Sequence, residues 1–253
     1  MYKHKKVGVV VPAYNEEEFI ASVINTMPGF VDRIYVVNDG STDRTLEVIC
    51  DVSKRNDRVV TVNREVRGGV GSAIISGHER ALQDDVDVVA VMAGDGQMDP
   101  TILSHMLDPV VSGKADYAKG DRLSRLEHRR EMPAWRMFGN FLLTNLSRIA
   151  SGYWHVSDPQ NGYTAISRET LQKLDLSRIE RGFAFENDML VKLNVVGARV
   201  VDVHHLAIYR GQHSKINYVS FIVKTSWVLL KGCVWRIWVK YVKQPAVSNR
   251  RDL

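Results

Sequence analysis

The sequence predicts an α/β protein with a mostly parallel sheet that is covered by helices on both faces. Two observations support this fold class. Short apolar, β-branched runs alternate with segments of helical spacing from the N-terminus to Lys119. Several of these runs end in acidic or glycine-rich turns, as at Asp39 and Asp95. Strands joined by helices give a parallel sheet, and such sheets bind ligands beyond the carboxyl ends of their strands.

The first half of the chain contains the clearest elements. Apolar runs predict strands at residues 5–11, 33–37, 58–63, 86–92 and 115–119. Helical spacing predicts helices between them at residues 16–26, 42–54, 70–83 and 99–111. We expect Asp99 to cap the last of these helices, with Pro100 at its first position.

The second half is less regular. Residues 121–136 are charged and without a period, which predicts a loop. Helices are expected at residues 136–152 and 183–196, strands at 164–167 and 199–203, and a turn at 158–162. The sequence has no internal repeat and no low-complexity tract.

Length and composition indicate an ordinary globular protein. The chain has 253 residues, of which 45% are hydrophobic and 25% charged, which suits one large α/β domain with an appendage. It has only two cysteines, so we expect a reducing compartment and no disulfide framework. No Cys/His spacing typical of zinc sites occurs. The basic N-terminus leads into a first strand and is not expected to be a targeting segment.

Positive charge is concentrated at the C-terminal end. Residues 210–253 carry a formal charge of +8, whereas the whole chain carries +5. No nucleic-acid-binding motif accompanies this charge, so we expect no nucleic-acid partner. Residues 218–242 combine three tryptophans with four cations in an apolar background. Such a helix is typical of a membrane interface, although an ordinary packed C-terminal helix is the alternative.

The loop after the strand at 86–92 is a candidate cation site. Asp95 and Gln97 alternate along it, so both side chains can face one ion. Mg²⁺ and Mn²⁺ prefer carboxylate, amide, water and phosphate oxygens. A solvated turn is the alternative, because turns are rich in Asp and Gly for steric reasons.

Four further segments are candidates for binding a nucleotide or phosphate. Asp39 ends a strand and can accept hydrogen bonds from a ribose or base, or it can belong to a turn and helix cap. Tyr14 lies beyond the first strand and can lie against a base. Gly71 opens a helix in a glycine-rich segment that either approaches an anion or allows close packing. Arg210 and Lys215 flank a glycine and a serine and can bind phosphate oxygens.

Taken together, these motifs resemble the inverting glycosyltransferases of family 2, which have the GT-A fold. The resemblance rests on residues 11–16, 37–43, 95–97 and 210–215, in this order, and covers about residues 5–216. It is nearest to the dolichol-phosphate mannosyltransferase and polyprenyl-phosphate glycosyltransferase branch, to which residues 158–162 and 210–215 point. The chain would then divide into a GT-A domain at 1–216 and a basic, Trp-rich helical segment at 217–253.

The resemblance implies roles for the matching positions. Asp95 and Gln97 would hold Mg²⁺ or Mn²⁺ on the donor diphosphate, and Arg122 would lie near the sugar or diphosphate. The nucleotide would contact Pro12, Ala13, Tyr14, Glu16 and Asp39. Donor and acceptor phosphates would meet Arg136, Arg210 and Lys215. The acceptor side would be lined by Asp158, Glu186 and Asp188.

The chain departs from the family pattern at three places. Ala93 stands where many members carry the first Asp of an Asp-x-Asp-x-Gln pattern, so one metal ligand is missing or replaced by water. Thr164 stands where the family often has Arg. No pair of membrane-spanning helices is expected after residue 216.

The expected reaction is inverting transfer of a sugar from a UDP- or GDP-linked donor to a polyprenyl or dolichyl monophosphate. We expect the enzyme to be peripheral at the cytoplasmic face of a membrane. The sequence does not decide whether it forms an oligomer. Three alternatives remain. The acceptor can be a soluble or cell-wall sugar, the protein can be a catalytically weak nucleotide-sugar binder, or it can be a nucleotidyltransferase. The last typically has a basic, glycine-rich loop after its first strand, which this sequence lacks.

Overall fold

The computed structural model describes residues 1–122, 134–205 and 218–243, without the side chains of 134–138, 140 and 218–220. Seven strands form one sheet in the order β3-β2-β1-β4-β6-β5-β7. Their bounds are β1 Val7–Ala13, β2 Arg33–Asp39, β3 Val59–Arg64, β4 Val88–Val91, β5 Tyr117–Asp121, β6 Thr164–Ser167 and β7 Val200–His204. Every pairing is parallel except those that β6 makes with β4 and β5. The predicted α/β class is confirmed.

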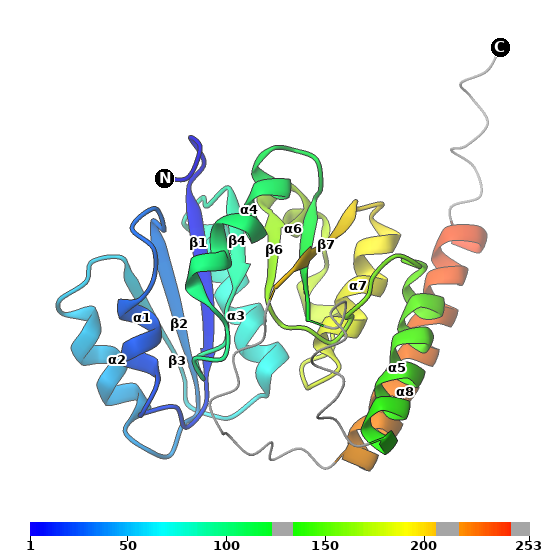
Figure 1. The fold of residues 1–253 in the computed structure, drawn as a ribbon, viewed down its shortest axis with the longest axis horizontal. Coiled ribbons are helices and arrows are strands. Elements are labelled where there is room, and N and C mark those ends of the chain that lie inside the picture. Colours follow the sequence, from blue (N-terminus) through cyan, green and yellow to red (C-terminus); the bar gives the residue numbers. More distant parts are fainter. Residues whose placement is uncertain (123–133, 206–217, 244–253) are drawn as a thin grey trace.

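Helices cover both faces of the sheet (Figure 1). Their bounds are α1 Ile20–Asn25, α2 Thr45–Ser53, α3 Val70–Gln83, η1 Pro100–Ile102, α4 Leu103–Val111, α5 Ala134–Ser151, α6 Arg168–Lys173, η3 Leu176–Arg178, α7 Phe185–Val195, α8 Tyr218–Ile237 and η4 Trp238–Lys243. Asp99 caps η1 by accepting a hydrogen bond from the Thr101 backbone N–H, as the sequence predicted.

The core has two apolar layers, one on each face of the sheet, and a smaller apolar cluster between α5, α7 and α8. Along β1, Val10 belongs to the layer beneath α3, α6 and α7, whereas Val9 and Val11 belong to the layer beneath α1, α2 and α4. This alternation follows from the two-residue period of a strand. All three valines are fully buried. The sheet is therefore rigidly held on both faces, and only its edges are available for a site.

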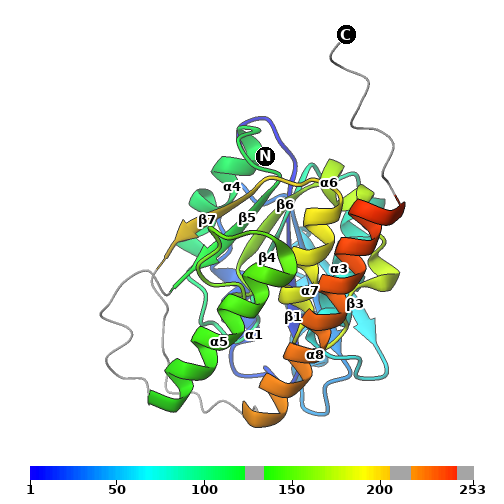
Figure 2. The ribbon, with the colours of Figure 1, turned by 90° about the vertical axis from the view of Figure 1, so that its right-hand side faces the viewer.

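Helices α5 and α8 pack side by side on the flank of the molecule (Figure 2). The Arg236 guanidinium of α8 caps the end of α5, because its Nε donates to the Ala150 carbonyl at 2.8 Å and its Nη2 to the Ile149 carbonyl at 3.1 Å. Ser147 Oγ of α5 donates to Asn187 Oδ1 of α7 at 2.6 Å. These bonds tie the outer pair of helices to the sheet-covering helix α7. Among the described residues, no helix has the length and apolarity that crossing a bilayer requires.

Two features differ from the sequence prediction. Residues 168–178 form α6 and η3, which were not predicted. Both are short and begin with side-chain caps, from Ser167 and Asp175, and do not depend on a long apolar period. The antiparallel direction of β6 was also not predicted.

We predict that Gly77→Ala destabilises the protein. A Cβ at residue 77 would lie 2.3 Å from Val10 Cγ1, so α3 would have to move away from β1. Overpacking of this kind costs about 1–3 kcal/mol, which outweighs the gain of about 1 kcal/mol in helix propensity. The midpoint of urea unfolding measures the effect. Gly29→Ala is the control, because a Cβ there meets nothing within 4 Å; equal midpoints for the two variants would contradict the prediction.

Candidate active site

The acidic turns lie at one edge of the sheet, the edge formed by the carboxyl ends of the parallel strands. β1, β2, β4 and β5 run in parallel, so the residues that follow them all lie at this edge. The antiparallel β6 begins at the same edge, because Val91 at the end of β4 pairs with Thr164 at the start of β6. The turn that precedes β6 therefore lies beside the loop that follows β4. Asp95 and Asp158 belong to these two neighbouring segments.

The loop that carries Asp95 is held against the end of β1. The Gly94 N–H donates to the Pro12 carbonyl at 3.2 Å, and a Cβ at Gly94 would lie 3.0 Å from that oxygen. Gly96 has a φ of +71°, which reverses the chain. The Gln97 N–H then donates to Asp95 Oδ1 at 2.9 Å. The loop is thus a tight turn, and burial raises the pKa of Asp95.

The oxygen ligands of this loop suit a hard cation that also binds water and substrate phosphates. Asp95 supplies carboxylate oxygens and Gln97 an amide oxygen, the ligand types that Mg²⁺ and Mn²⁺ prefer. The described residues contain no cluster of three or more His, Cys, Asp or Glu that would form a complete protein cage. Mg²⁺ is ordinarily held by one or two carboxylates, waters and substrate phosphates, so two protein ligands fit this pattern.

Ala93 brings no oxygen to this loop. Its backbone N–H donates to Met98 Sδ at 3.2 Å, so the thioether of Met98 lies against residue 93. Met98 Cε also lies 3.5 Å from the position of a Cβ on Gly162, in the turn before β6. The Met98 side chain therefore bridges the loop after β4 and the turn before β6.

Asp39 braces the glycine-rich segment at the start of α3. Its Oδ1 accepts from the Gly68 N–H at 2.9 Å and from Arg64 Nε at 3.0 Å, and its Oδ2 accepts from the Gly69 N–H at 2.8 Å. Asp39 as a whole is 3% exposed. Asp39 thus positions the loop in this structure, and its role in binding a nucleotide stays a prediction.

Gly71 is explained by packing. A Cβ at this position would lie 2.6 Å from the Glu180 carbonyl oxygen, and Gly71 itself is buried. The neighbouring Ser72 N–H donates to the Arg181 carbonyl at 3.0 Å. The glycine allows the start of α3 to approach the segment before α7, and a role of Gly71 in binding the donor stays a prediction.

The remaining residues predicted to bind the nucleotide lie around the end of β1. Pro12 and Ala13 belong to β1 itself, with Pro12 half-buried and Ala13 buried. The Arg67 guanidinium lies 3.8 Å from the centre of the Tyr14 ring, so that ring is stacked by a cation. The Glu16 N–H donates to Thr45 Oγ1 at 2.8 Å and joins this segment to α2.

Arg122 and Asp158 form an ion pair across the edge of the sheet. Arg122 Nε donates to Asp158 Oδ2 at 2.8 Å, and its Nη2 lies 3.4 Å from Oδ1. The Asp158 side chain is 3% exposed, whereas that of Arg122 is 38% exposed. The guanidinium thus has a buried anchor and is itself partly exposed.

Glu186 joins this group from α7, and sequence reasoning missed the cation that faces it. Burial raises the pKa of Glu186, and the charge of Lys119 opposes that rise. Lys119 lies on β5 and is fully buried. A lysine inside a strand that is buried on both faces is the signal that would have revealed it.

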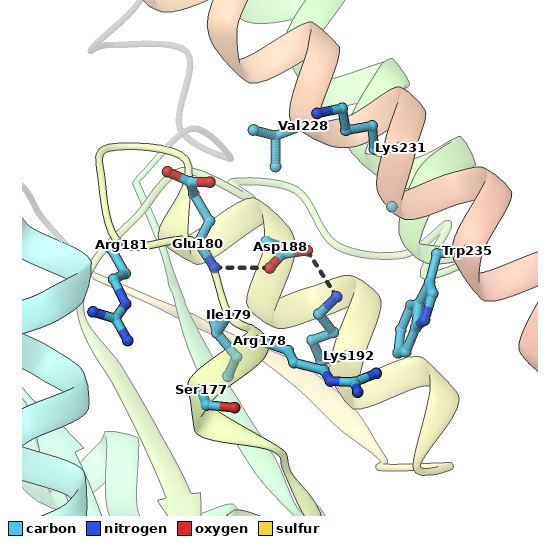
Figure 3. A pocket seen from close by; sticks show the side chains of 11 residues that line it. Ser177, Arg178, Ile179, Glu180, Arg181, Asp188, Lys192, Val228, Lys231 and Trp235 are labelled. Atoms are coloured by element: carbon cyan, nitrogen blue, oxygen red, sulfur yellow. Dashed lines mark hydrogen bonds and ion pairs between the residues drawn. The ribbon is translucent and has the colours of Figure 1, made fainter.

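Asp188 lies on a different face of α7 from Glu186, as expected for residues two positions apart. Its Oδ2 accepts from the Glu180 N–H at 2.9 Å, and its Oδ1 lies 3.5 Å from Lys192 Nζ. Figure 3 shows both contacts in a pocket of about 540 Å³ between α7, α8 and the 177–181 segment. The structure therefore does not bring Asp188 together with Asp158 and Glu186.

The other predicted phosphate-binding residues lie outside the described part of the site. Arg210 and Lys215 fall within 206–217, and the side chain of Arg136 is not described. Their roles stay predictions.

Comparison with known proteins agrees with the sequence motifs. Residues 8–175 match the family model described as glycosyl transferase family 2. The UDP-N-acetylglucosamine–dolichyl-phosphate N-acetylglucosaminyltransferase of Methanococcus voltae is 28% identical over 86% of this chain and 94% of its own length. The polyprenol monophosphomannose synthase of Mycolicibacterium smegmatis is 31% identical over 77% of this chain and 74% of its own length.

A solved structure shares the fold. Glucosyl-3-phosphoglycerate synthase from Mycobacterium tuberculosis, in complex with Mn²⁺, UDP-glucose and phosphoglyceric acid, matches with a TM-score of 0.67. The match covers 91% of this chain and 80% of that one, at 22% identity. The likeness to dolichyl- and polyprenyl-phosphate enzymes that the motifs indicated is confirmed by the relatives. This chain belongs to glycosyl transferase family 2 and is a glycosyltransferase.

Proposed function

We propose that the enzyme transfers a sugar from a nucleotide diphosphate sugar to a polyprenyl or dolichyl monophosphate at the surface of a membrane. The observation that carries the proposal is an apolar, cationic face on the outer side of α5 and α8. Both helices begin on the side of the molecule where the parallel strands end (Figure 1). A lipid held on this face would present its phosphate toward the edge that gathers Asp95, Arg122 and Asp158.

The outer helical face is formed by exposed apolar side chains. On α8 they recur at alternating steps of three and four residues, which places them on one side of the helix. The face comprises Phe141, Leu142 and Ile149 of α5 and Val223, Trp227, Leu230, Val234, Ile237, Trp238, Tyr241 and Val242 of α8 and η4. So many large apolar side chains on adjacent helices would be unfavourable in water, and they indicate a surface that binds a partner.

Cations and aromatic rings adjoin one another on this face. Lys231 Nζ lies 5.0 Å from the ring centre of Trp227, and Lys243 Nζ lies 5.9 Å from that of Trp238. Tryptophan favours the boundary between headgroups and hydrocarbon, and lysine is attracted to anionic lipid headgroups. An anionic bilayer therefore suits this face better than a neutral protein partner. A peripheral position at the cytoplasmic face of the membrane is part of the proposal.

The transfer is proposed as a single inverting displacement. A phosphate oxygen of the acceptor forms a bond to the anomeric carbon, while the bond from that carbon to the donor diphosphate breaks and leaves a nucleoside diphosphate. A divalent ion on Asp95 and Gln97 would offset negative charge on the diphosphate. The accessible side of Arg122 can stabilise the same charge or receive the acceptor phosphate.

The acids need not remove a proton in this reaction. A phosphate monoester is already anionic near neutral pH, since its second pKa is about 6. Asp158 is paired with Arg122, which suits a positioning role. If the acceptor were instead a sugar hydroxyl, a base would be required, and Glu186 with its raised pKa would suit that role better than Asp158.

The acceptor class can be tested by a radiolabelled-donor screen with Mg²⁺ or Mn²⁺. UDP-glucose, UDP-N-acetylglucosamine and GDP-mannose are each offered with a short polyprenyl phosphate, with 3-phosphoglycerate or with a disaccharide. We expect metal-dependent labelling of the polyprenyl phosphate alone. Labelling of a soluble acceptor only would support the rival family 2 activity. Donor binding without transfer to any acceptor would support a nucleotide-sugar binding protein.

We predict that Asp95→Ala lowers turnover by at least about 10²-fold, the usual effect of losing one preorganised charge-stabilising group. Mn²⁺ binding in the presence of nucleoside diphosphate, followed by electron paramagnetic resonance, should weaken in parallel. Asp51→Ala is the control, because Asp51 is an exposed acid that pairs with Lys54 on α2. Near-full activity with unchanged Mn²⁺ binding in Asp95→Ala would exclude this carboxylate as a metal ligand.

We predict that Lys231→Glu and Trp227→Ser each weaken binding to vesicles that contain anionic lipid. A lysine near such a surface contributes about 1 kcal/mol, so reversing its charge should lower the partition coefficient by about tenfold or more. Co-sedimentation with vesicles at low and high salt measures this.

Matched controls for the vesicle experiment are Lys54→Glu, just after α2, and Trp154→Ser, both exposed and outside the outer helical face. Equal losses in controls and test variants would show that the face is not the membrane contact. Concentration-dependent dimerisation that Trp227→Ser abolishes, without vesicle binding, would assign the face to a second copy of the chain.

A further inference from the structure

A buried lysine lies next to the acids of the site. Lys119 is fully buried on β5, where a charged group is costly unless it is paired. Its Nζ donates to the Asn161 carbonyl at 2.6 Å. Burial lowers the pKa of Lys119 to about 8, and the charges of Glu186 and Asp158 act in the opposite direction. The neighbouring acids therefore favour the charged form of a lysine that burial alone would neutralise.

The contact from Lys119 fixes the turn before β6. Asn161, whose carbonyl it holds, also accepts from the Tyr163 N–H at 2.9 Å through Oδ1, and its Nδ2 lies 2.8 Å from His205 Nε2. The Asn161 N–H in turn bonds to the Asp158 carbonyl at 3.3 Å. Displacing Lys119 would therefore loosen the segment that places Asp158 opposite Arg122.

The charges around Lys119 come from several elements. Glu186 is contributed by α7, Asp158 by the turn before β6, Arg122 by the segment after β5 and Asp202 by β7. Lys119 is foremost among the groups that lower the pKa of Glu186. Glu186 and Asp158 are thus balanced by Lys119 and Arg122. Loss of Lys119 would remove one of the two described cations that act on Glu186.

Glu186 and the loop that carries Asp95 both approach Gly162. Glu186 Oε1 and Met98 Cε each lie 3.5 Å from the position of a Cβ on Gly162. The carboxylate and the loop after β4 therefore meet at the same glycine. A change in the charge of Glu186 would change the electrostatic potential where the donor diphosphate is proposed to bind.

We propose that Lys119 is a positioning residue for sugar transfer: its ammonium ties β5 to the turn that carries Asp158 and supplies the positive charge opposite Glu186. The link to transfer rests on the proposed function. The coupling between Lys119 and Glu186 does not, since it follows from the buried cluster alone. The two can therefore be tested separately.

The first experiment measures the titration of Glu186 without any reaction. The carboxyl δ-¹³C resonance of Glu186 is assigned by its absence in Glu186→Gln. Its chemical shift is followed with pH in wild type and in Lys119→Met, and the midpoint of each titration is compared. Removing the positive charge that lowers the pKa of Glu186 should raise the midpoint by about one pH unit or more. Lys6→Met is the matched control, because Lys6 Nζ also donates to a backbone carbonyl, that of Asp84, at 2.6 Å. An unchanged midpoint in folded Lys119→Met overturns the proposal.

The second experiment measures the pH profile of kcat for transfer. A raised pKa for Glu186 moves its protonation to higher pH, so the acidic limb of Lys119→Met should move upward, with a loss of about tenfold in kcat per unit on that limb. Glu186→Gln should abolish the shift. A fall in kcat that is uniform with pH, or a purely stability-linked loss, would overturn the positioning role.

Two further outcomes separate a failure of this proposal from misfolding of the variant and from a failure of the proposed function. If Lys119→Met does not fold, the double variant Lys119→Met/Glu186→Gln should fold, since it removes one charge of each sign; failure of the double variant overturns the electrostatic account. If wild type does not label polyprenyl phosphate while the Glu186 resonance shifts as expected, the lipid acceptor is refuted and the coupling stands.

Discussion

The site depends on the pairing of β4 with an antiparallel β6. If β6 ran parallel to β4, its first residues would lie at the opposite edge of the sheet and Asp158 would lie far from Asp95. The observed register places Thr164 beside Val91, so one edge receives both the end of β4 and the start of β6. Gly162 and Met98 then approach closely across this junction. A single strand reversal thereby converts two distant acidic segments into one site.

This junction also concentrates charge in a buried place. Asp158 and Glu186 are almost fully buried, and their negative charge must be compensated for both to remain ionised. Arg122 and Lys119 supply that compensation from the same strand and the segment after it. Arg122 is partly exposed whereas Lys119 is fully buried, so only Arg122 of these two cations is exposed to solvent. The former can meet a ligand, and the latter acts through the residues it holds.

The sequence predicted the alternating half of the fold well. β1 to β4 and the helices between them follow strong apolar periods, and α3 was placed at its observed bounds. The direction of β6 could not be predicted, because four residues with an apolar pattern contain no information about their partner. α6 was missed for a related reason, since its six residues depend on the Ser167 cap and on tertiary packing.

The candidate site was predictable in part. Turns rich in polar residues and glycine contain Asp39, Asp95 and Asp158, and this composition indicated a site. The structure places these turns along one edge of the sheet. Lys119 was missed because a lysine at the end of an apolar run reads as the exposed end of a strand, whereas β5 continues to Asp121. The packing of Gly71 and the separation of Asp188 from Glu186 depend on contacts with the 180–181 segment, which no local pattern reports.

In the proposed function, the position of α5 and α8 would allow one protein to join a water-soluble donor to a lipid. Arg236 caps α5 from α8, and Ser147 bonds to Asn187 of α7, so the two outer helices are fixed to the catalytic unit by polar contacts. These helices are also joined to α7 by a small apolar cluster of Ala150, Val191 and Leu229. Many of their other large apolar side chains are exposed on the outer surface. A membrane-bound phosphate that reaches the sheet edge would pass from this surface toward the accessible side of Arg122, while the nucleotide would occupy the side formed by β1 and β2. The two substrates would approach from different directions, as an in-line displacement at the anomeric carbon requires.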